Sequence, residues 1–138
     1  MTKVLRVDIW SDVVCPWCYI GKRRFERALA ALADEPVEIR VRYRAYQLDP
    51  SAPADSSSSV REAYARKFGG PERAEAIIRN LTDTAAAEGL DFRLDIARRS
   101  NTILAHRLLW LAAERLGCDA QTRLKEDLLH AYFTGGCN

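Results

Sequence analysis

Two segments near the start of the chain, residues 4–10 and 37–45, alternate between apolar residues and polar or charged ones. A period of two is typical of a β-strand that turns one face towards a core. In the first segment the apolar positions predict one well-buried face. In the second, every other residue is charged, which predicts a half-exposed strand near a sheet edge. These charged residues are Glu38, Arg40, Arg42 and Arg44.

Between these segments the apolar residues recur at helical spacing. They are Ile20, Phe25, Ala28, Leu29 and Leu32. This spacing predicts a helix that ends near residues 34–36. A strand, a helix and a second strand joined by one short crossover predict a βαβ unit in an α/β fold. Ligands of such sheets usually bind beyond the carboxyl end of a strand, and the first predicted strand is followed there by two cysteines.

The second half of the chain has a different pattern. Residues 49–59 hold two prolines and five serines without an apolar period, which is typical of a connecting segment. Everything after it favours helices, with glycine-containing breaks between them. The predicted helices cover residues 62–68, 71–89, 101–116 and 120–133. We therefore predict a βαβ part at residues 1–50 and a helical domain at residues 51–138.

Composition limits the function classes only weakly. The 138 residues include 48% hydrophobic ones, enough for the core of one ordinary domain. With 21 basic and 19 acidic residues the net charge is +2, which gives no reason to expect a nucleic acid or an anionic membrane as partner. The first residues carry scattered charges instead of an apolar signal segment, and no stretch approaches membrane-spanning length. We therefore expect a cytoplasmic protein, in which cysteines are more often catalytic than structural.

The motif Cys15-Pro16-Trp17-Cys18 follows the first predicted strand and opens the first predicted helix. Two intervening residues bring both sulfurs within one turn, as a disulfide requires. Unpaired N–H groups and the helix dipole favour a thiolate at Cys15, which is the expected nucleophile. Cys18 is then placed to resolve a mixed disulfide. Pro16 suits the first helical turn, and Trp17 is expected to shield the sulfurs or contact a partner.

The same two cysteines also fit two other interpretations. A CxxC pair is half of many zinc sites, but tetrahedral zinc needs about four ligands, commonly as two close pairs. Here Cys118 and Cys137 stand alone, and both histidines belong to helical patterns. Two inert packing cysteines would not need Pro and Trp between them. The sequence therefore favours a redox centre without a metal.

The residues 7–21, VDIWSDVVCPWCYIG, resemble the amino-terminal signature of the cytoplasmic, FrnE-like branch of DsbA-family thioredoxin-fold proteins. Residues 46–50 and 101–108 resemble later blocks of the same family. Its relatives include glutathione-using 2-hydroxychromene-2-carboxylate isomerases and kappa-class glutathione transferases. The resemblance implies a thioredoxin-like βαβ unit with an inserted α-helical domain.

One departure from this family concerns the end of the chain. Members continue into two more strands, a final helix and a cis-proline loop that faces the cysteines. Residues 135–138 do not resemble the family at that point. We therefore expect the sequence to be a truncated form of a longer protein. The unpaired sheet edge that remains makes a homodimer an expected assembly of this form.

Three functions follow from these patterns. The first is a thiol–disulfide oxidoreductase, of the disulfide oxidoreductase or isomerase type, acting on a protein or small molecule without a bound cofactor. The alternative is a glutathione-dependent isomerase or transferase for a small aromatic or polyketide-like substrate, with glutathione as co-substrate; Cys18 would then be unnecessary. The third is a peptide-binding module whose partner capture survives replacement of both cysteines.

Other residues carry weaker signals. His106 lies in an apolar helical pattern and is by default a core histidine, while the resemblance implies a position lining the active-site cleft. Asn101 is a candidate helix cap, and the resemblance places it at the same cleft. Basic residues at positions 22–24 are candidates for stabilising a thiolate, although a basic helix face is usually only solvated. Cys118 is expected to be a packing residue, and Cys137 an exposed thiol.

Overall fold

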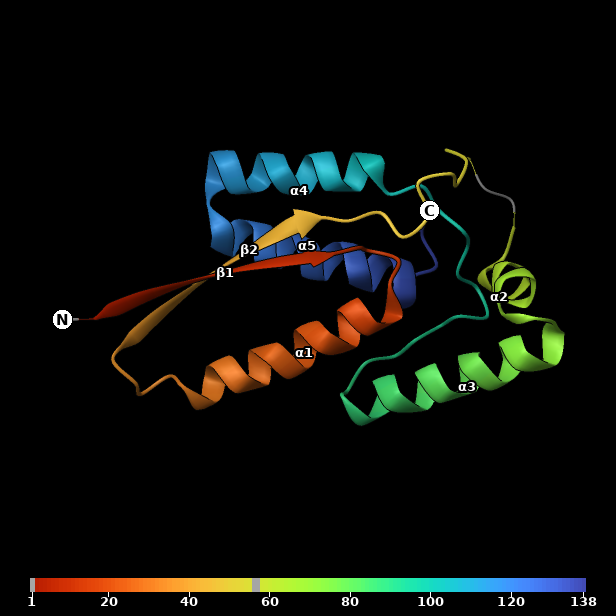
Figure 1. Ribbon diagram of the computed structural model, residues 1–138, viewed down its shortest axis with the longest axis horizontal. Helices are drawn as coiled ribbons and strands as arrows, with labels where there is room; N and C mark the ends of the chain where they lie inside the picture. Colours follow the sequence, from red (N-terminus) through yellow and green to blue (C-terminus); the bar gives the residue numbers. More distant parts are fainter. Residues whose placement is uncertain (1, 56–57) are drawn as a thin grey trace.

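The computed structural model describes residues 2–55 and 58–138. At its centre lie two parallel strands, β1 (Lys3–Ser11) and β2 (Val37–Ala45), joined through helix α1 (Pro16–Ala31) (Figure 1). Their register places Val7 opposite Val41. The βαβ unit expected from the alternating pattern is therefore present, with the cysteine motif at the carboxyl end of β1.

The burial of β1 differs from the sequence prediction. Leu5 is 53% exposed, and Val7 and Ile9 are only partly buried, so the predicted well-buried face is wrong. The reason lies in the placement of the helices that pack on the sheet, since α4 (Ile103–Leu116) and α5 (Cys118–Phe133) contact β2. The half-exposed character predicted for β2 is confirmed.

Helices α2 (Val60–Phe68) and α3 (Pro71–Ala87) pack against each other beyond the carboxyl ends of the strands (Figure 1). A capping box begins α2: the Ser59 side chain accepts from the Glu62 N–H, and the Glu62 carboxylate accepts from the Ser59 N–H. Gly69, with φ of 96°, ends α2 in the left-handed conformation that favours glycine.

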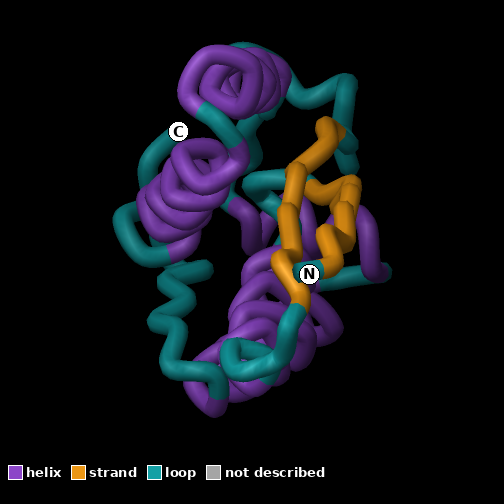
Figure 2. Tube along the Cα trace, turned by 90° about the vertical axis from the view of Figure 1, so that its left-hand side faces the viewer, coloured by secondary structure: helices purple, strands orange, loops and turns teal. Residues whose placement is uncertain are grey.

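Figure 2 shows α4 at one end of the view, α1 at the other and α5 between them, beside the sheet. The Gln121 side chain on α5 pairs with backbone groups at the edge of β2. Its Oε1 accepts from the Tyr43 N–H at 2.8 Å, and its Nε2 donates to the Tyr43 carbonyl at 2.9 Å and to the Leu109 carbonyl at 3.0 Å. One buried amide thus satisfies edge groups that a neighbouring strand would otherwise pair.

The core joins both halves of the chain. Tyr19 of α1 stacks on Phe92, and Phe92 stacks on Phe133 of α5 with ring centroids 4.5 Å apart. Ile20 and Leu81 belong to the same buried cluster. Because residues before and after position 50 share this core, they pack as one unit; the boundary between 1–50 and 51–138 stays a prediction.

Most predicted helices are observed with small shifts at their ends. The first ends at Ala31 instead of near residue 34, the fourth begins at Ile103 instead of Asn101, and the fifth begins at Cys118 instead of Ala120. Part of the predicted connection at 49–59, namely residues 56–57, lies outside the described residues. Among the described residues, no helix combines the length and apolar character needed to cross a bilayer.

Candidate active site

The cysteine motif forms the start of α1. Cys15 is the N-cap residue in an extended conformation, and Pro16 is the first helical residue, where no N–H is needed. The Cys18 N–H lies 3.3 Å from Cys15 Sγ and donates to it. All four cysteines are free thiols. Cys15 Sγ therefore receives a backbone donor at the positive end of a helix, an arrangement that stabilises a thiolate.

The two thiols titrate as a coupled pair. Their mutual hydrogen bond lowers the pKa of Cys18 to about 6, and the same bond raises the pKa of Cys15. In such a pair the two pKa values belong to the pair, because a negative charge on one sulfur is stabilised by the proton on the other. The pair thus loses its first proton below neutrality. That Cys15 is the sulfur that attacks stays a prediction.

The two cysteines face different cavities. A cavity of about 670 Å³ is lined by Cys15, and a second of about 340 Å³ is lined by Cys18, with Trp17 lining both. Trp17 is 52% exposed. A substrate in the larger cavity would meet the Cys15 sulfur first, which fits the order of attack and resolution expected from the sequence.

The larger cavity lies between the cysteine motif and α2 and α3. Its walls are mainly apolar, and basic side chains line it as well: Arg66, Lys67 and Arg99. Arg99 is paired with Asp49 at 2.6 Å. The apolar part of the wall includes Val14, Val60, Tyr64, Ile77, Leu81 and Tyr132. Such a cavity suits an apolar side chain or ring beside a reacting sulfur.

Asp12 fixes the loop between β1 and α1. Burial opposes its ionisation, but hydrogen bonds with His106, the Leu48 N–H, Thr102 and the Val13 N–H hold the pKa of Asp12 below its ordinary value. The two backbone bonds measure 2.8 Å each. The ionised carboxylate thus ties the loop before the cysteines to the segment after β2. Sequence reasoning missed this role, although an aspartate three residues before a helix-starting cysteine is a visible signal.

Neither Asn101 nor His106 lines the cavity at Cys15. Asn101 Oδ1 accepts from the Ile103 N–H at 3.0 Å, so it caps α4 from one residue before the N-cap Thr102. Its Nδ2 donates to the Ala52 carbonyl at 2.7 Å. His106 is buried and contacts Asp12. The cleft-lining positions implied by the resemblance are therefore not observed for these two residues in this structure, and both act as links between segments.

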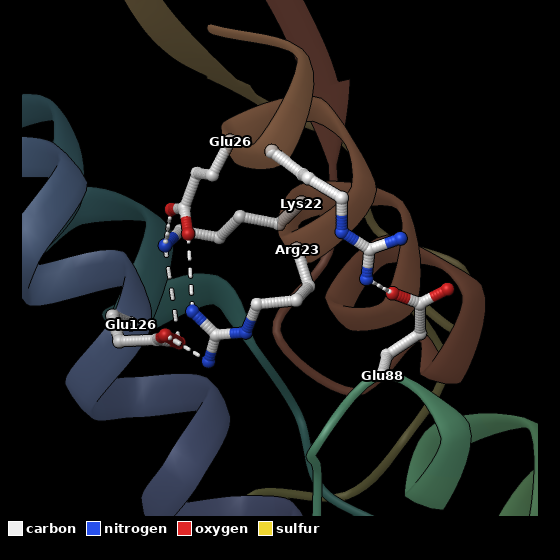
Figure 3. Close-up of polar contacts among 6 residues, drawn as sticks. Lys22, Arg23, Glu26, Glu88 and Glu126 are labelled. Atoms are coloured by element: carbon white, nitrogen blue, oxygen red, sulfur yellow. Dashed lines mark hydrogen bonds and ion pairs between the residues drawn. The ribbon is translucent and has the colours of Figure 1, made fainter. Parts of the chain in front are cut away.

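The basic residues after the motif are engaged in ion pairs. Lys22 and Arg23 both contact Glu26 and Glu126 (Figure 3). Arg24 and Arg27 both contact Glu88. The Arg23–Glu126 pair joins α1 to α5. The charge of these residues is thus compensated locally. Of the two other cysteines, Cys118 is partly buried at the start of α5 and Cys137 is exposed.

One charged residue near the motif was missed at the sequence level. Lys125 on α5 is only 1% exposed, and its Nζ has no hydrogen-bond partner among the described residues. It lies 5.4 Å from the centroid of the Tyr43 ring. The available signal was its spacing: Gln121, Lys125 and Leu129 recur every four residues and all face the core.

Metal binding has no support in the described part of the chain. Across residues 2–55 and 58–138, no three His, Cys, Asp or Glu side chains are grouped as ligands of one ion.

Comparisons with known proteins agree with this geometry. A family model for DsbA-like thioredoxin domains matches residues 6–138. No curated protein sequence matches the chain. Among solved structures, the chain is similar to the crystal structure of a probable DsbA oxidoreductase from Streptomyces coelicolor, with 39% sequence identity and a TM-score of 0.84. The match covers 96% of this chain and 56% of that protein, so the chain spans little more than half of the length of its relative.

Proposed function

Because the chain belongs to the family of DsbA-like thioredoxin domains, we propose that it is a thiol–disulfide oxidoreductase in which Cys15 attacks and Cys18 resolves. The observation that carries this proposal is the division of the motif between two cavities. Cys15 lines the larger one, whereas Cys18 does not line it and lines the smaller one. A nucleophile that faces the substrate cavity and a resolving thiol that lies outside it fit a two-step exchange.

The reaction follows from ordinary thiol–disulfide chemistry. The Cys15 thiolate attacks one sulfur of a substrate disulfide, a mixed disulfide forms, and the other substrate sulfur leaves as a thiolate. The Cys18 thiolate then attacks the Cys15 sulfur, which closes the Cys15–Cys18 disulfide and releases the second substrate thiol. The substrate gains two electrons and the dithiol loses them. Starting from the oxidised motif, the same steps in reverse oxidise a substrate dithiol.

The apolar cavity at Cys15 suits a substrate with an apolar side chain beside its reacting sulfur. Within the family, the signature at residues 7–21 favours the FrnE-like branch, and a disulfide isomerase activity would use the same first step without the second. Both refinements are parts of this proposal, which rests on the resemblance and on the cavity.

The decisive experiment measures alkylation of Cys15 as a function of pH, with mass spectrometry of the oxidised protein. We expect alkylation to follow the first deprotonation of the coupled thiol pair, at a pH below that of a free thiol, and a disulfide between Cys15 and Cys18 after oxidation. An inflection above pH 8, as for a free thiol, together with no such disulfide, would contradict a redox role for the motif.

The apolar cavity of about 670 Å³ also favours a second candidate, a glutathione-dependent isomerase or transferase for a small aromatic or polyketide-like molecule. Here glutathione would be a co-substrate and Cys18 would be dispensable. If Cys18→Ala retains turnover of an unsaturated ketone that stops when glutathione is removed, this candidate replaces the oxidoreductase. Loss of exchange in the same variant, with no glutathione-dependent turnover, supports the oxidoreductase.

A further inference from the structure

The surroundings of Lys125 differ from those of the other buried lysine near the motif. Lys22, one turn after Cys18, is held by the carboxylates of Glu26 and Glu126 (Figure 3). The Lys125 ammonium has no carboxylate within ion-pair distance and no hydrogen-bond acceptor among the described residues. A buried lysine without a partner is costly to a fold and therefore requires an explanation.

The groups around Lys125 are of two kinds. The Tyr43 ring of β2 offers its face to the ammonium, a favourable but modest contact. Tyr43 lines the cavity of about 340 Å³ together with Cys18 and Lys22, so the ammonium over its ring lies beside the start of α1. The charged and ionisable groups there that act on Lys125 are Asp12, Cys15, Cys18 and Lys22. Asp12 is ionised and already accepts hydrogen bonds from two backbone N–H groups, from His106 and from Thr102. The thiol pair is thus the one neighbouring acid whose charge depends on its redox state.

We propose that the Lys125 ammonium is a positioning charge for the Cys15–Cys18 pair. From outside the cavity at Cys15, this charge stabilises the thiolate of the reduced motif. This inference rests on the proposed oxidoreductase function. Lys125 touches no substrate, because it does not line the cavity at Cys15. Its effect is electrostatic: a positive charge in a region of low dielectric favours the thiolate over the thiol, and it favours the dithiol state over the uncharged disulfide.

The balance of charges explains why the lysine is unpaired. Burial lowers the pKa of Lys125 to about 8, and the Coulombic influence of the thiol pair and of Asp12 acts in the opposite direction. A carboxylate bound directly to Nζ would cancel this charge, as Glu26 and Glu126 do for Lys22. An unpaired ammonium keeps its field available to the motif at neutral pH.

The first test replaces Lys125 with methionine, which keeps the length and the apolar stem of the side chain. We expect the apparent pKa of the thiol pair to rise by about one unit. The reduction potential should become more negative by about 30 mV, the conversion of a tenfold change for two electrons, because the reduced form loses its stabilisation. Lys125→Arg keeps the charge and should bring both values back towards those of the wild type.

The matched control is Lys22→Met, which removes an equally buried but paired lysine. It should leave the pKa of the thiol pair within a few tenths of a unit. Equal shifts in Lys22→Met and Lys125→Met, or no shift in the latter, would overturn the inference. A loss of stability in Lys125→Met without a change of pKa would assign Lys125 a merely structural role and would overturn it as well.

A measurement on the unmodified chain does not depend on the folding of any variant. Because coupling between two sites is reciprocal, oxidation of the motif should lower the pKa of Lys125 by about one unit. The titration of the Lys125 side chain, followed by NMR in the reduced and oxidised protein, measures this shift directly. An unchanged Lys125 titration refutes the inference. If no Cys15–Cys18 disulfide forms at all, the proposed function fails instead, so the two failures are distinguishable.

Discussion

His106 Nε2 lies 2.9 Å from Asp12 Oδ1, which joins α4 to the loop that precedes the cysteine motif across 94 positions of the sequence. An ionised carboxylate can only accept, so Nε2 of His106 carries the donated proton. Both side chains are almost completely buried. The contact therefore fixes the position of the loop at Asp12 relative to α4. Because this loop leads into α1, the contact also helps to fix the direction in which the chain enters that helix.

The first prediction concerns Asp12→Asn. This change removes the charge that accepts from His106 and from two backbone N–H groups, and one of its oxygens becomes an amide donor facing these donors. We expect a loss of about 1–3 kcal/mol in the free energy of unfolding at pH 7. Urea denaturation at this pH measures it. Asp8→Asn is the control, since Asp8 is part of an exposed pair with Arg44 and should matter by less than about 0.5 kcal/mol.

The pH dependence of this difference has a definite sign. The pKa of Asp12 is lower in the folded chain than in the unfolded one, where it is about 4. Its contribution is therefore fully present above pH 4 and disappears as the pH falls through the lower folded value. The stability gap between the wild type and Asp12→Asn should narrow below pH 4. A gap that stays constant down to pH 2 would contradict the ionised state of Asp12.

The second prediction concerns Gln121→Ala. The change leaves the N–H and carbonyl of Tyr43 and the carbonyl of Leu109 without their buried partner. We expect a loss of at least about 2 kcal/mol in unfolding free energy, measured by chemical denaturation. Gln47→Ala is the matched control, because Gln47 makes only long contacts of 3.5 Å and should cost less than about 0.5 kcal/mol. Equal losses in the two variants would show that Gln121 is not needed at the strand edge.

Local pattern predicted much of this fold, for physical reasons. Alternation placed both strands, and the break at Gly69 and the helix start at Pro71 were found because the preferences of these residues are set by the backbone. The cap at Ser59 was missed, because this serine belongs to the serine-rich segment predicted as a connection. The resemblance of residues 7–21 indicated the DsbA family, which the family match confirms. Burial along β1 was not predictable, because it depends on which strand the later helices cover.

In the candidate site, too, local features were predictable from the sequence and contacts between distant segments were not. The motif itself is local, so its place at the start of a helix followed from its spacing. The residues that surround the motif come from far along the chain. His106 contacts Asp12, and Lys125 lies over the ring of Tyr43, which lines the same cavity as Cys18. A lysine in the register of a buried helical face is the one sequence signal of such a group, and it was hidden by the expectation that lysines are solvated.

The third prediction concerns the aromatic cluster that joins α1 to α5. Phe133 is completely buried and contacts the rings of Tyr19, Phe92 and Tyr132. Phe133→Ala should therefore cost about 3–5 kcal/mol of unfolding free energy. Phe68→Ala removes the same side chain from a position that is 36% exposed and should cost far less. Thermal and chemical denaturation of both variants measure the difference, and a similar cost for the two would exclude a single core shared by both halves of the chain.

The last prediction separates attack from resolution. In Cys18→Ala, the Cys15 thiolate can still attack a disulfide, but no second thiol can release the product, so the mixed disulfide should accumulate. With a small aromatic disulfide as reagent, mass spectrometry should show one adduct per chain, located at Cys15. In Cys15→Ser the exchange should fall by at least about a hundredfold, because the remaining thiol does not line the larger cavity. Cys118→Ala is the control: Cys118 also begins a helix but has no partner thiol three residues further on, and its loss should leave exchange unchanged. An adduct that collects at Cys18 in Cys15→Ser as fast as at Cys15 in Cys18→Ala would reverse the assigned roles.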